Sequence, residues 1–244
     1  SSDVCSSDLK NYKKGKKNME KKDINVLEQM QNMTVDLNSK VLIEKAEKDG
    51  VETMYKRKLG YKVQCGFGLQ GVCCRNCGMG PCRISAKTPR GLCGADEHTI
   101  VGRNFARMVA GGTAAHSDHA RDITHTLALT KPGGDYQVKE PQKLVEFAKF
   151  MDVDPEGKDV YELAHEVAEV CLMEFGKPFG VSKLLKRAPK VRQEIWHNLG
   201  IEPRAIDREI ATVMHSTHIG CCADLEAIIA MSMRCSMADG WAGS

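Results

Sequence analysis

The chain has 244 residues, of which 42% are apolar, enough to bury the core of one large domain or two small ones. Its 35 basic and 32 acidic residues leave a net charge of +3, and residues 1–25 alone hold seven lysines against four acidic residues. The remainder is therefore close to neutral, which excludes an extended basic surface that binds nucleic acid. No apolar run approaches the roughly 18 residues that a membrane span needs.

The first 25 residues predict a disordered, lysine-rich tail. The first nine, SSDVCSSDL, have the repetitive character of a non-native addition, and we assign them no fold. A solvated leader explains the lysines better than binding to nucleic acid or acidic lipid does. Because no apolar signal segment follows the N-terminus, and because eleven cysteines suit a reducing interior, we expect a cytoplasmic protein.

Helical periodicity dominates the chain after the tail. Helices are expected at residues 38–48, then to about 59, and at 97–129, 141–151, 160–175, 181–199, 204–216 and 224–237. The expected helix at 97–129 is one long helix or two, with a kink or a close-packing point at Gly111-Gly112. No segment alternates as a strand would. The sequence therefore predicts a mainly α fold, in which residues 26–244 form one helical domain with inserted loops rich in glycine and cysteine.

The inserted loops carry six cysteines within 29 residues: Cys65, Cys73, Cys74, Cys77, Cys82 and Cys93. That density indicates a metal centre. Four cysteine thiolates complete one iron-sulfur cluster, so six leave two over. Two per chain is what a cluster shared between two copies of the chain requires.

Two other uses of these thiols fit the spacing less well. A zinc site normally shows two short Cys-x-x-Cys pairs, and here Cys74 and Cys77 alone have that spacing. Disulfides need an oxidising compartment, which the N-terminus does not indicate. The adjacent Cys73 and Cys74 argue against both, because neighbouring side chains diverge. Iron-sulfur ligation is the favoured interpretation, and zinc remains the alternative.

The motifs around the cysteines resemble a known family. They are Cys65-Gly66-Phe67-Gly68, Gly71-Val72-Cys73-Cys74-Arg75-Asn76-Cys77, Gly80-Pro81-Cys82-Arg83-Ile84 and Gly91-Leu92-Cys93-Gly94-Ala95. Together with residues 114–119, 200–210 and 237–240, they resemble the N-terminal region of the nickel-containing anaerobic carbon monoxide dehydrogenases. The resemblance covers about residues 35–244. It departs in the stretch between Cys82 and Cys93, which is shorter than in some members of that family.

The resemblance implies two 4Fe-4S sites. Cys65 and Cys73 of each chain would bind a cluster on the two-fold axis of a homodimer, and the other four clustered cysteines would bind a cluster within each chain. It also implies that the nickel-iron-sulfur catalytic cluster of the full-length enzyme has its ligands C-terminal to Ser244, so that this segment alone is inactive. The implied reaction oxidises CO with water to CO2 and passes two electrons to a ferredoxin-like acceptor. Whether acetyl-CoA synthase is also a partner stays open.

Residues 66–71 match the dinucleotide pattern Gly-x-Gly-x-x-Gly. That fingerprint requires a buried strand before the loop and a helix after it, and here cysteines bracket the loop instead. Glycines in such loops let backbone N–H groups approach sulfide and thiolate. We therefore read these glycines as part of the metal site.

A series of titratable residues lies within the expected helix at 97–129. His116, His119, Asp122 and His125 follow one another at intervals of three residues and would climb about 13 to 14 Å along a helix. Partly buried structural histidines are the ordinary explanation of such a pattern. The family resemblance favours a proton relay. Asp122 departs from it, because an aspartate with an ordinary pKa near 3.9 stays ionised at neutral pH.

The remaining cysteines do not suggest another metal site. If residues 224–237 are helical, Cys235 lies some 15 to 20 Å from Cys222, too far to share a cluster with it. Cys171, Cys221, Cys222 and Cys235 are therefore expected to be unligated, as is Cys5. His215 and His218 suggest a mixed zinc site with Cys221 and Cys222, but a helix terminus next to core cysteines explains them equally well.

Two alternatives to a carbon monoxide dehydrogenase remain. A related hybrid-cluster hydroxylamine reductase would show a different N-terminal cysteine spacing without the adjacent Cys73-Cys74 pair. A non-catalytic interaction module stabilised by zinc belongs to another class. Iron with acid-labile sulfide indicates either enzyme, and zinc alone indicates the module.

Overall fold

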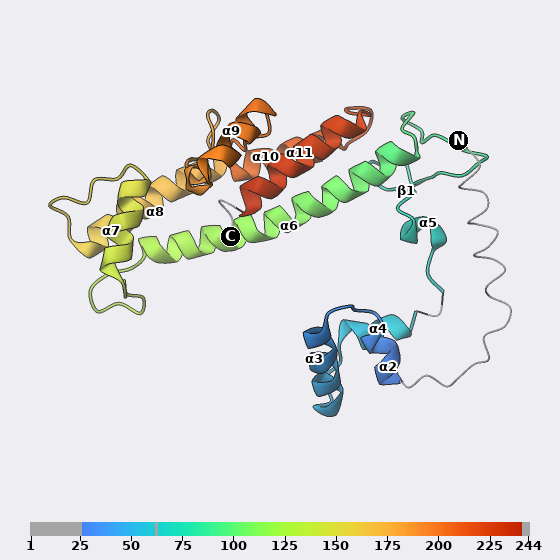
Figure 1. Cartoon of the computed structure of the whole chain (residues 1–244), viewed down its shortest axis with the longest axis horizontal. Coiled ribbons are helices and arrows are strands. Elements are labelled where there is room, and N and C mark those ends of the chain that lie inside the picture. The colour runs from blue at the N-terminus through green and yellow to red at the C-terminus, as the bar shows by residue number, and fades with distance from the viewer. Residues whose placement is uncertain (1–25, 62, 241–244) are drawn as a thin grey trace. The chain divides into compact units, whose positions relative to one another are not determined.

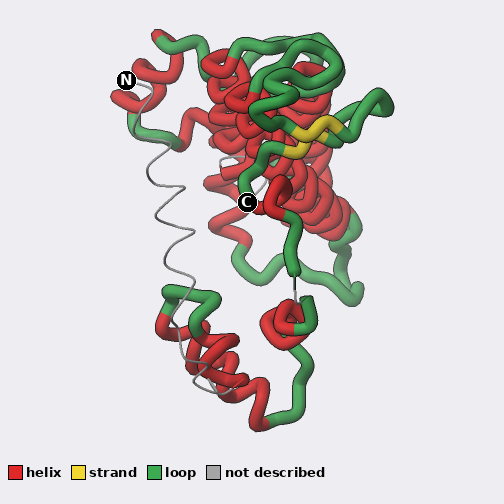
Figure 2. The backbone as a smooth tube through the Cα atoms, turned by 90° about the vertical axis from the view of Figure 1, so that its right-hand side faces the viewer, coloured by secondary structure: helices red, strands yellow, loops and turns green. Residues whose placement is uncertain are grey.

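The computed structural model describes residues 26–61 and 63–240, and helices dominate it (Figures 1 and 2). The predicted mainly α fold is confirmed. The predicted tail, residues 1–25, lies outside the described residues. The chain divides into two compact units, residues 1–65 and 66–244, at a boundary within the range that the sequence assigned to one domain. Among the helices that the structure describes, none is both long enough and apolar enough to cross a membrane.

Three short helices form the described part of the first unit: α2 (Val26–Gln31), α3 (Leu37–Lys48) and α4 (Met54–Leu59). The N-cap of α3 is Asp36, whose carboxylate accepts a hydrogen bond from the Ser39 N–H at 2.5 Å. Among the described residues of this unit, Met30 and Ile43 are the buried apolar side chains. The described part thus has a very small core, and the last residue of the unit is Cys65.

The second unit begins with a short helix and a hairpin and continues into a long helix. The helix α5 (Gly66–Leu69) precedes the strands β1 (Cys73–Cys74) and β2 (Cys82–Arg83), which are yellow in Figure 2. The long helix α6 (Glu97–Ala128) has 32 residues and is therefore about 48 Å long. It starts where Asp96 accepts a hydrogen bond from the Thr99 N–H at 2.8 Å.

The helix α6 is continuous through Gly111 and Gly112, where the sequence predicted a kink or a close-packing point. A Cβ added at either glycine would meet no other atom within 4 Å in the described structure. The close-packing prediction is therefore wrong for this part of the chain. Both positions are exposed.

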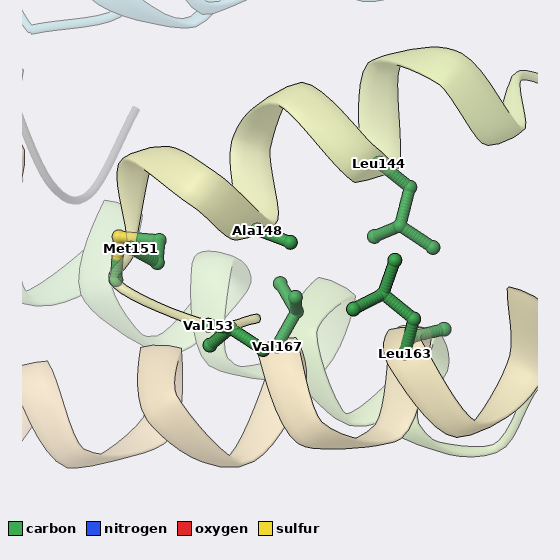
Figure 3. Close-up of a cluster of buried hydrophobic side chains, with 7 residues drawn as sticks. Leu144, Ala148, Met151, Val153, Leu163 and Val167 are labelled. Carbon is green, nitrogen blue, oxygen red and sulfur yellow. The ribbon is translucent and has the colours of Figure 1, made fainter. Parts of the chain in front are cut away.

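Two later helices pack against each other at the far end of the unit. They are α7 (Pro141–Phe150) and α8 (Val160–Gly176), and their facing side chains form a buried apolar cluster (Figure 3). Leu144 and Ala148 of α7 point toward Leu163 and Val167 of α8. Burial of these branched side chains stabilises the pairing, at about 1.5 to 3 kcal/mol for each Val or Leu.

The predicted helix at 181–199 is wrong in one respect, because it is broken. A 3-10 helix, η1 (Lys183–Arg187), is followed by α9 (Lys190–Asn198). Between them Ala188 has ψ near 150°, an extended conformation. A residue before proline is driven out of the helical region by the proline ring, and Pro189 follows Ala188. The break is therefore a local effect that the Ala-Pro pair encodes.

The helices α10 (Ile206–Ser216) and α11 (Leu225–Ala238) both pack against α6. The small side chains Ala106 and Ala110 of α6 meet Val213 of α10 and Ile228 of α11 in a shared core. Small residues on α6 let these helices approach closely. The arrangement brings the start of α6 near the loop that joins α10 to α11.

A buried ion-pair network strengthens this region. Glu209 on α10 is 1% exposed, and its carboxylate accepts from Arg204 Nε at 2.8 Å and Nη2 at 3.0 Å. Arg234 on α11 approaches the same carboxylate at 2.8 Å. Two guanidinium groups thus compensate one buried carboxylate and tie α10 to α11.

Candidate metal centre

The hairpin places two of the clustered cysteines opposite each other. In the β1–β2 pairing, Cys74 lies opposite Cys82 and Cys73 lies opposite Arg83. The turn passes very close to the strands at Gly80, where a Cβ would lie 3.1 Å from both the Cys74 carbonyl oxygen and the Cys82 nitrogen. The close backbone contact therefore disfavours any residue with a Cβ at this position.

A second loop brings Cys93 toward the hairpin. The Gly91 N–H donates to the Ala95 carbonyl at 2.8 Å, which closes a tight turn around Cys93. The Leu92 N–H points at Cys82 Sγ at 3.5 Å, so a backbone donor from this loop already serves a thiol of the hairpin. Ala95 is buried, and α6 begins two residues later.

Four of the six clustered cysteines line one cavity: Cys74, Cys77, Cys82 and Cys93. The start of α6 and the loop after α10 complete its wall with Ile100, Arg103, Thr217 and Ile219. The empty space between these residues is about 360 Å³, including the part that is open to solvent.

The surroundings of Cys93 favour the thiolate form of its side chain. Burial raises the pKa of this thiol, but hydrogen bonds from the Ala95 backbone, the Arg103 guanidinium and the Gly220 backbone outweigh burial and bring the pKa below its ordinary value. Metal ions are bound by the thiolate and not by the thiol. The position of Cys93 thus favours the ligand form.

The residues around this cavity fit an iron-sulfur cluster. Four sulfur donors are the ligand set that a 4Fe-4S cluster takes. The Asn76 side-chain nitrogen is buried at the cavity wall and has no hydrogen-bond partner in the described structure, although a buried amide normally finds one. Sulfide and thiolate accept such hydrogen bonds. Asn76 is therefore a donor that a cluster would satisfy.

The other two clustered cysteines are not among the residues that line this cavity. Cys73 is half-buried on β1, and Cys65 is exposed at the end of the first unit. The loop that carries Cys73 is pinned to α6, since the Asn104 amide donates to the carbonyl oxygens of Gly71 at 2.9 Å and Cys73 at 3.0 Å. Cys73 is thus held in a defined position outside the four-cysteine cavity.

The predicted relay residues all lie on α6 and are all exposed in the described structure. Each step of three residues turns 60° short of a full circle, so the series from His116 to His125 winds half-way around the helix. His119 and Asp122 occupy the intermediate steps. His116 Nδ1 lies 2.7 Å from Asp239 Oδ1, and no hydrogen bond within the described residues joins the four to one another. Their role as a relay stays a prediction.

The cysteines outside the loops show the character of core thiols or isolated thiols. Cys235 is buried and contacts Thr113 Oγ1 at 3.4 Å, and burial raises its pKa. Burial also raises the pKa of Cys171 to about 11, with a further contribution from Glu174. Cys221 is exposed. In the described part of the chain, no three His, Cys, Asp or Glu side chains are arranged to hold a single metal ion.

A model of the Prismane/CO dehydrogenase family matches residues 72–244, which is more than half of the chain. The chain belongs to this family. It is 46% identical over 216 residues to carbon monoxide dehydrogenase 1 of Methanosarcina acetivorans, a match that covers 86% of this chain and 34% of that protein. The chain thus spans about a third of the length of the relatives that it matches.

Solved structures of Prismane/CO dehydrogenase relatives show the same fold. The nickel-free carbon monoxide dehydrogenase of Thermococcus sp. AM4 superposes with a TM-score of 0.76 at 44% identity, over 88% of this chain and 35% of that one. A structure of acetyl-CoA synthase/carbon monoxide dehydrogenase superposes with a TM-score of 0.75 at 33% identity, over 91% of this chain and 34% of that one.

Sequence reasoning found the cysteines of this family member but missed the polar residues around them. The structure identifies three of them: Asn76 and Arg103 line the cavity, and Asn104 holds the Cys73 loop against α6. A signal for one of them does exist in the sequence. Arg103 stands in the apolar stripe formed by Ile100, Ala106 and the residues that follow, where a charged side chain is unusual.

Proposed function

We propose that the chain is the N-terminal, electron-transferring portion of a carbon monoxide dehydrogenase. The whole enzyme would convert CO and H2O to CO2, two protons and two electrons, and pass the electrons to a ferredoxin-like acceptor. We place the ligands of the nickel-iron-sulfur catalytic cluster outside these 244 residues, so the segment alone would not turn over CO. The names of the relatives support this reaction.

Four thiols around one cavity carry the proposal for this segment. Cys74, Cys77, Cys82 and Cys93 would hold a 4Fe-4S cluster within the chain, which supplies one-electron transfer when bound. The protein would position that cluster and donate hydrogen bonds to it from Asn76 and the Leu92 backbone. Cys74 is buried and the other three thiols are half-buried, which limits the access of water to the sulfur atoms.

Cys65 and Cys73 would supply a second cluster, shared with another copy of the chain. Two ligands per chain become four across a two-fold axis. The exposure of Cys65 and the position of Cys73 outside the four-cysteine cavity support separate roles for these two residues. The enzyme would thus be a cytoplasmic homodimer that works anaerobically, either alone or with acetyl-CoA synthase.

Replacement of one cavity cysteine tests the ligand assignment. In the anaerobically purified full-length protein, Cys77→Ser should lower iron by up to about four per chain and remove one reduced-cluster paramagnetic signal. Cys221→Ser, an exposed thiol outside the cavity, is the control and should change neither quantity. Unchanged iron and signal in Cys77→Ser would contradict the assignment, and zinc in place of iron would favour the interaction module.

A further inference from the structure

Arg103 is a buried cation at the wall of the four-cysteine cavity. Its side chain is 1% exposed and projects from the second turn of α6. Nε donates to the Cys222 carbonyl oxygen at 3.0 Å, and Nη2 donates to the same oxygen. Nη1 points at Cys93 Sγ at 3.5 Å. Nε and Nη2 of the guanidinium are thus held by a backbone carbonyl, and Nη1 faces the Cys93 thiol.

No carboxylate in the described structure lies within ion-pair distance of Arg103. A guanidinium keeps its charge, and an uncompensated buried charge is strongly destabilising. The chain compensates its other buried charges in this region, since Glu209 is paired with both Arg204 and Arg234. The group that Arg103 faces is Cys93 Sγ, a thiol that lines the cavity, so the negative charge that would compensate the guanidinium belongs in that cavity.

We propose that Arg103 is a positioning residue that compensates the negative charge of the iron-sulfur centre and sets its reduction potential. This inference rests on the proposed cluster at Cys74, Cys77, Cys82 and Cys93. The fixed anchor at Cys222 keeps the guanidinium in place in both oxidation states, so the charge is already oriented before an electron arrives.

The direction of the effect follows from charge. Four thiolates give such a cluster a net negative charge, and reduction adds one more electron to it. The attraction between a buried cation and the cluster grows with the negative charge of the cluster, and the protein interior screens it weakly. The cation therefore stabilises the reduced cluster more than the oxidised one. Removing the cation should therefore make the cluster harder to reduce and shift its potential to more negative values.

The test is a redox titration of the full-length protein, which follows the paramagnetic signal that Cys77→Ser removes. In Arg103→Gln we expect the equilibrium constant for reduction of the cluster at a fixed potential to fall at least tenfold. For one electron, this corresponds to a shift of about 59 mV in the reduction potential. Arg103→Lys keeps the charge and should recover most of this loss. The control is Arg107→Gln, because Arg107 also ties α6 to the segment after α10, through Thr217 Oγ1 at 2.7 Å, but has no sulfur contact.

Each outcome decides the matter. A negative shift in Arg103→Gln that exceeds the shift in Arg107→Gln supports the proposal. Loss of iron from Arg103→Gln with iron retained in Arg103→Lys also supports it, because charge alone would then restore the centre. Equal potentials in Arg103→Gln and the parent overturn it, as does loss of iron from both Arg103 variants. If the parent protein holds no iron, the proposed cluster itself fails, whatever Arg103 does.

Discussion

His119 lies near the middle of the exposed series on α6, between His116 and Asp122. A histidine has two ring nitrogens, so it can accept a proton at one and donate a proton from the other, whereas a carboxylate only accepts hydrogen bonds. In a path that passes protons stepwise, His119 is therefore a working position and Asp122 is a weak one.

We predict that His119→Ala in the full-length enzyme slows CO oxidation by roughly tenfold or more without loss of metal. Asp122→His should leave turnover equal or raise it, because it completes a series of four histidines. The measurement is the rate across a pH range together with metal content. Normal turnover of His119→Ala at every pH would contradict the relay and indicate that these histidines are structural.

Prediction from sequence reached some residues of the candidate site and not others. Six cysteines at short spacing indicate a metal centre without any structure, and iron-sulfur ligation is the favoured interpretation. Arg103 and Asn76 are different, because their roles depend on neighbours far away in the chain. Arg103 meets Cys222 across more than a hundred residues, and no local pattern encodes that contact.

At the scale of elements, the contact between α10 and α11 depends on the buried carboxylate of Glu209. It has two arginine partners and almost no exposure to solvent. Breaking a buried ion pair from one side leaves the other charges uncompensated, which costs far more than the loss of a surface pair.

We predict that Glu209→Gln lowers the free energy of unfolding by about 3 to 5 kcal/mol, because Arg204 and Arg234 lose their counter-charge. Asp207→Asn is the control on the same helix. Its ion pair with Arg121 is partly exposed, and its loss should cost about 1 kcal/mol or less. Anaerobic denaturant unfolding of the two full-length variants gives the comparison, and similar midpoints would show that the Glu209 network contributes little.

The helices themselves were largely predictable from the sequence. The expected helix at 97–129 matches Glu97–Ala128 closely, since an aspartate N-cap and a long apolar stripe mark it. The break at Pro189 was encoded in the Ala-Pro pair and was missed because helical periodicity continues on both sides of it. The prediction at Gly111-Gly112 failed for another reason. Glycine permits the close approach of another segment but does not require it, and no described segment packs against these two positions.

At the scale of the whole molecule, the two cysteines outside the cavity bear on assembly. Cys65 and Cys73 belong to different compact units of the chain. In the proposed function, a cluster shared through these residues would join two chains. Dimerisation and iron binding should therefore fail together.

We predict that the double variant Cys65→Ser with Cys73→Ser loses about two irons per chain, keeps the cluster at Cys74 to Cys93 and associates more weakly. Light scattering and iron analysis of the anaerobic full-length protein measure both effects. Cys171→Ser with Cys221→Ser is the matched control, because it also removes two thiols. An unchanged iron content in the Cys65 and Cys73 variant would mean that these residues bind nothing between subunits.

The unbroken length of α6 has a consequence for how charge is handled. Arg103 and His116 are thirteen residues apart on one helix, a rise of about 20 Å, which is more than twice the roughly 8 Å over which salt screens exposed charges. The helix therefore keeps the proposed cluster site and the exposed histidines at a fixed separation. In the proposed function, a change in the charge of the cluster would act on those histidines only across that distance, where Coulomb attraction is small. Electron transfer and proton transfer would thus be only weakly coupled to each other.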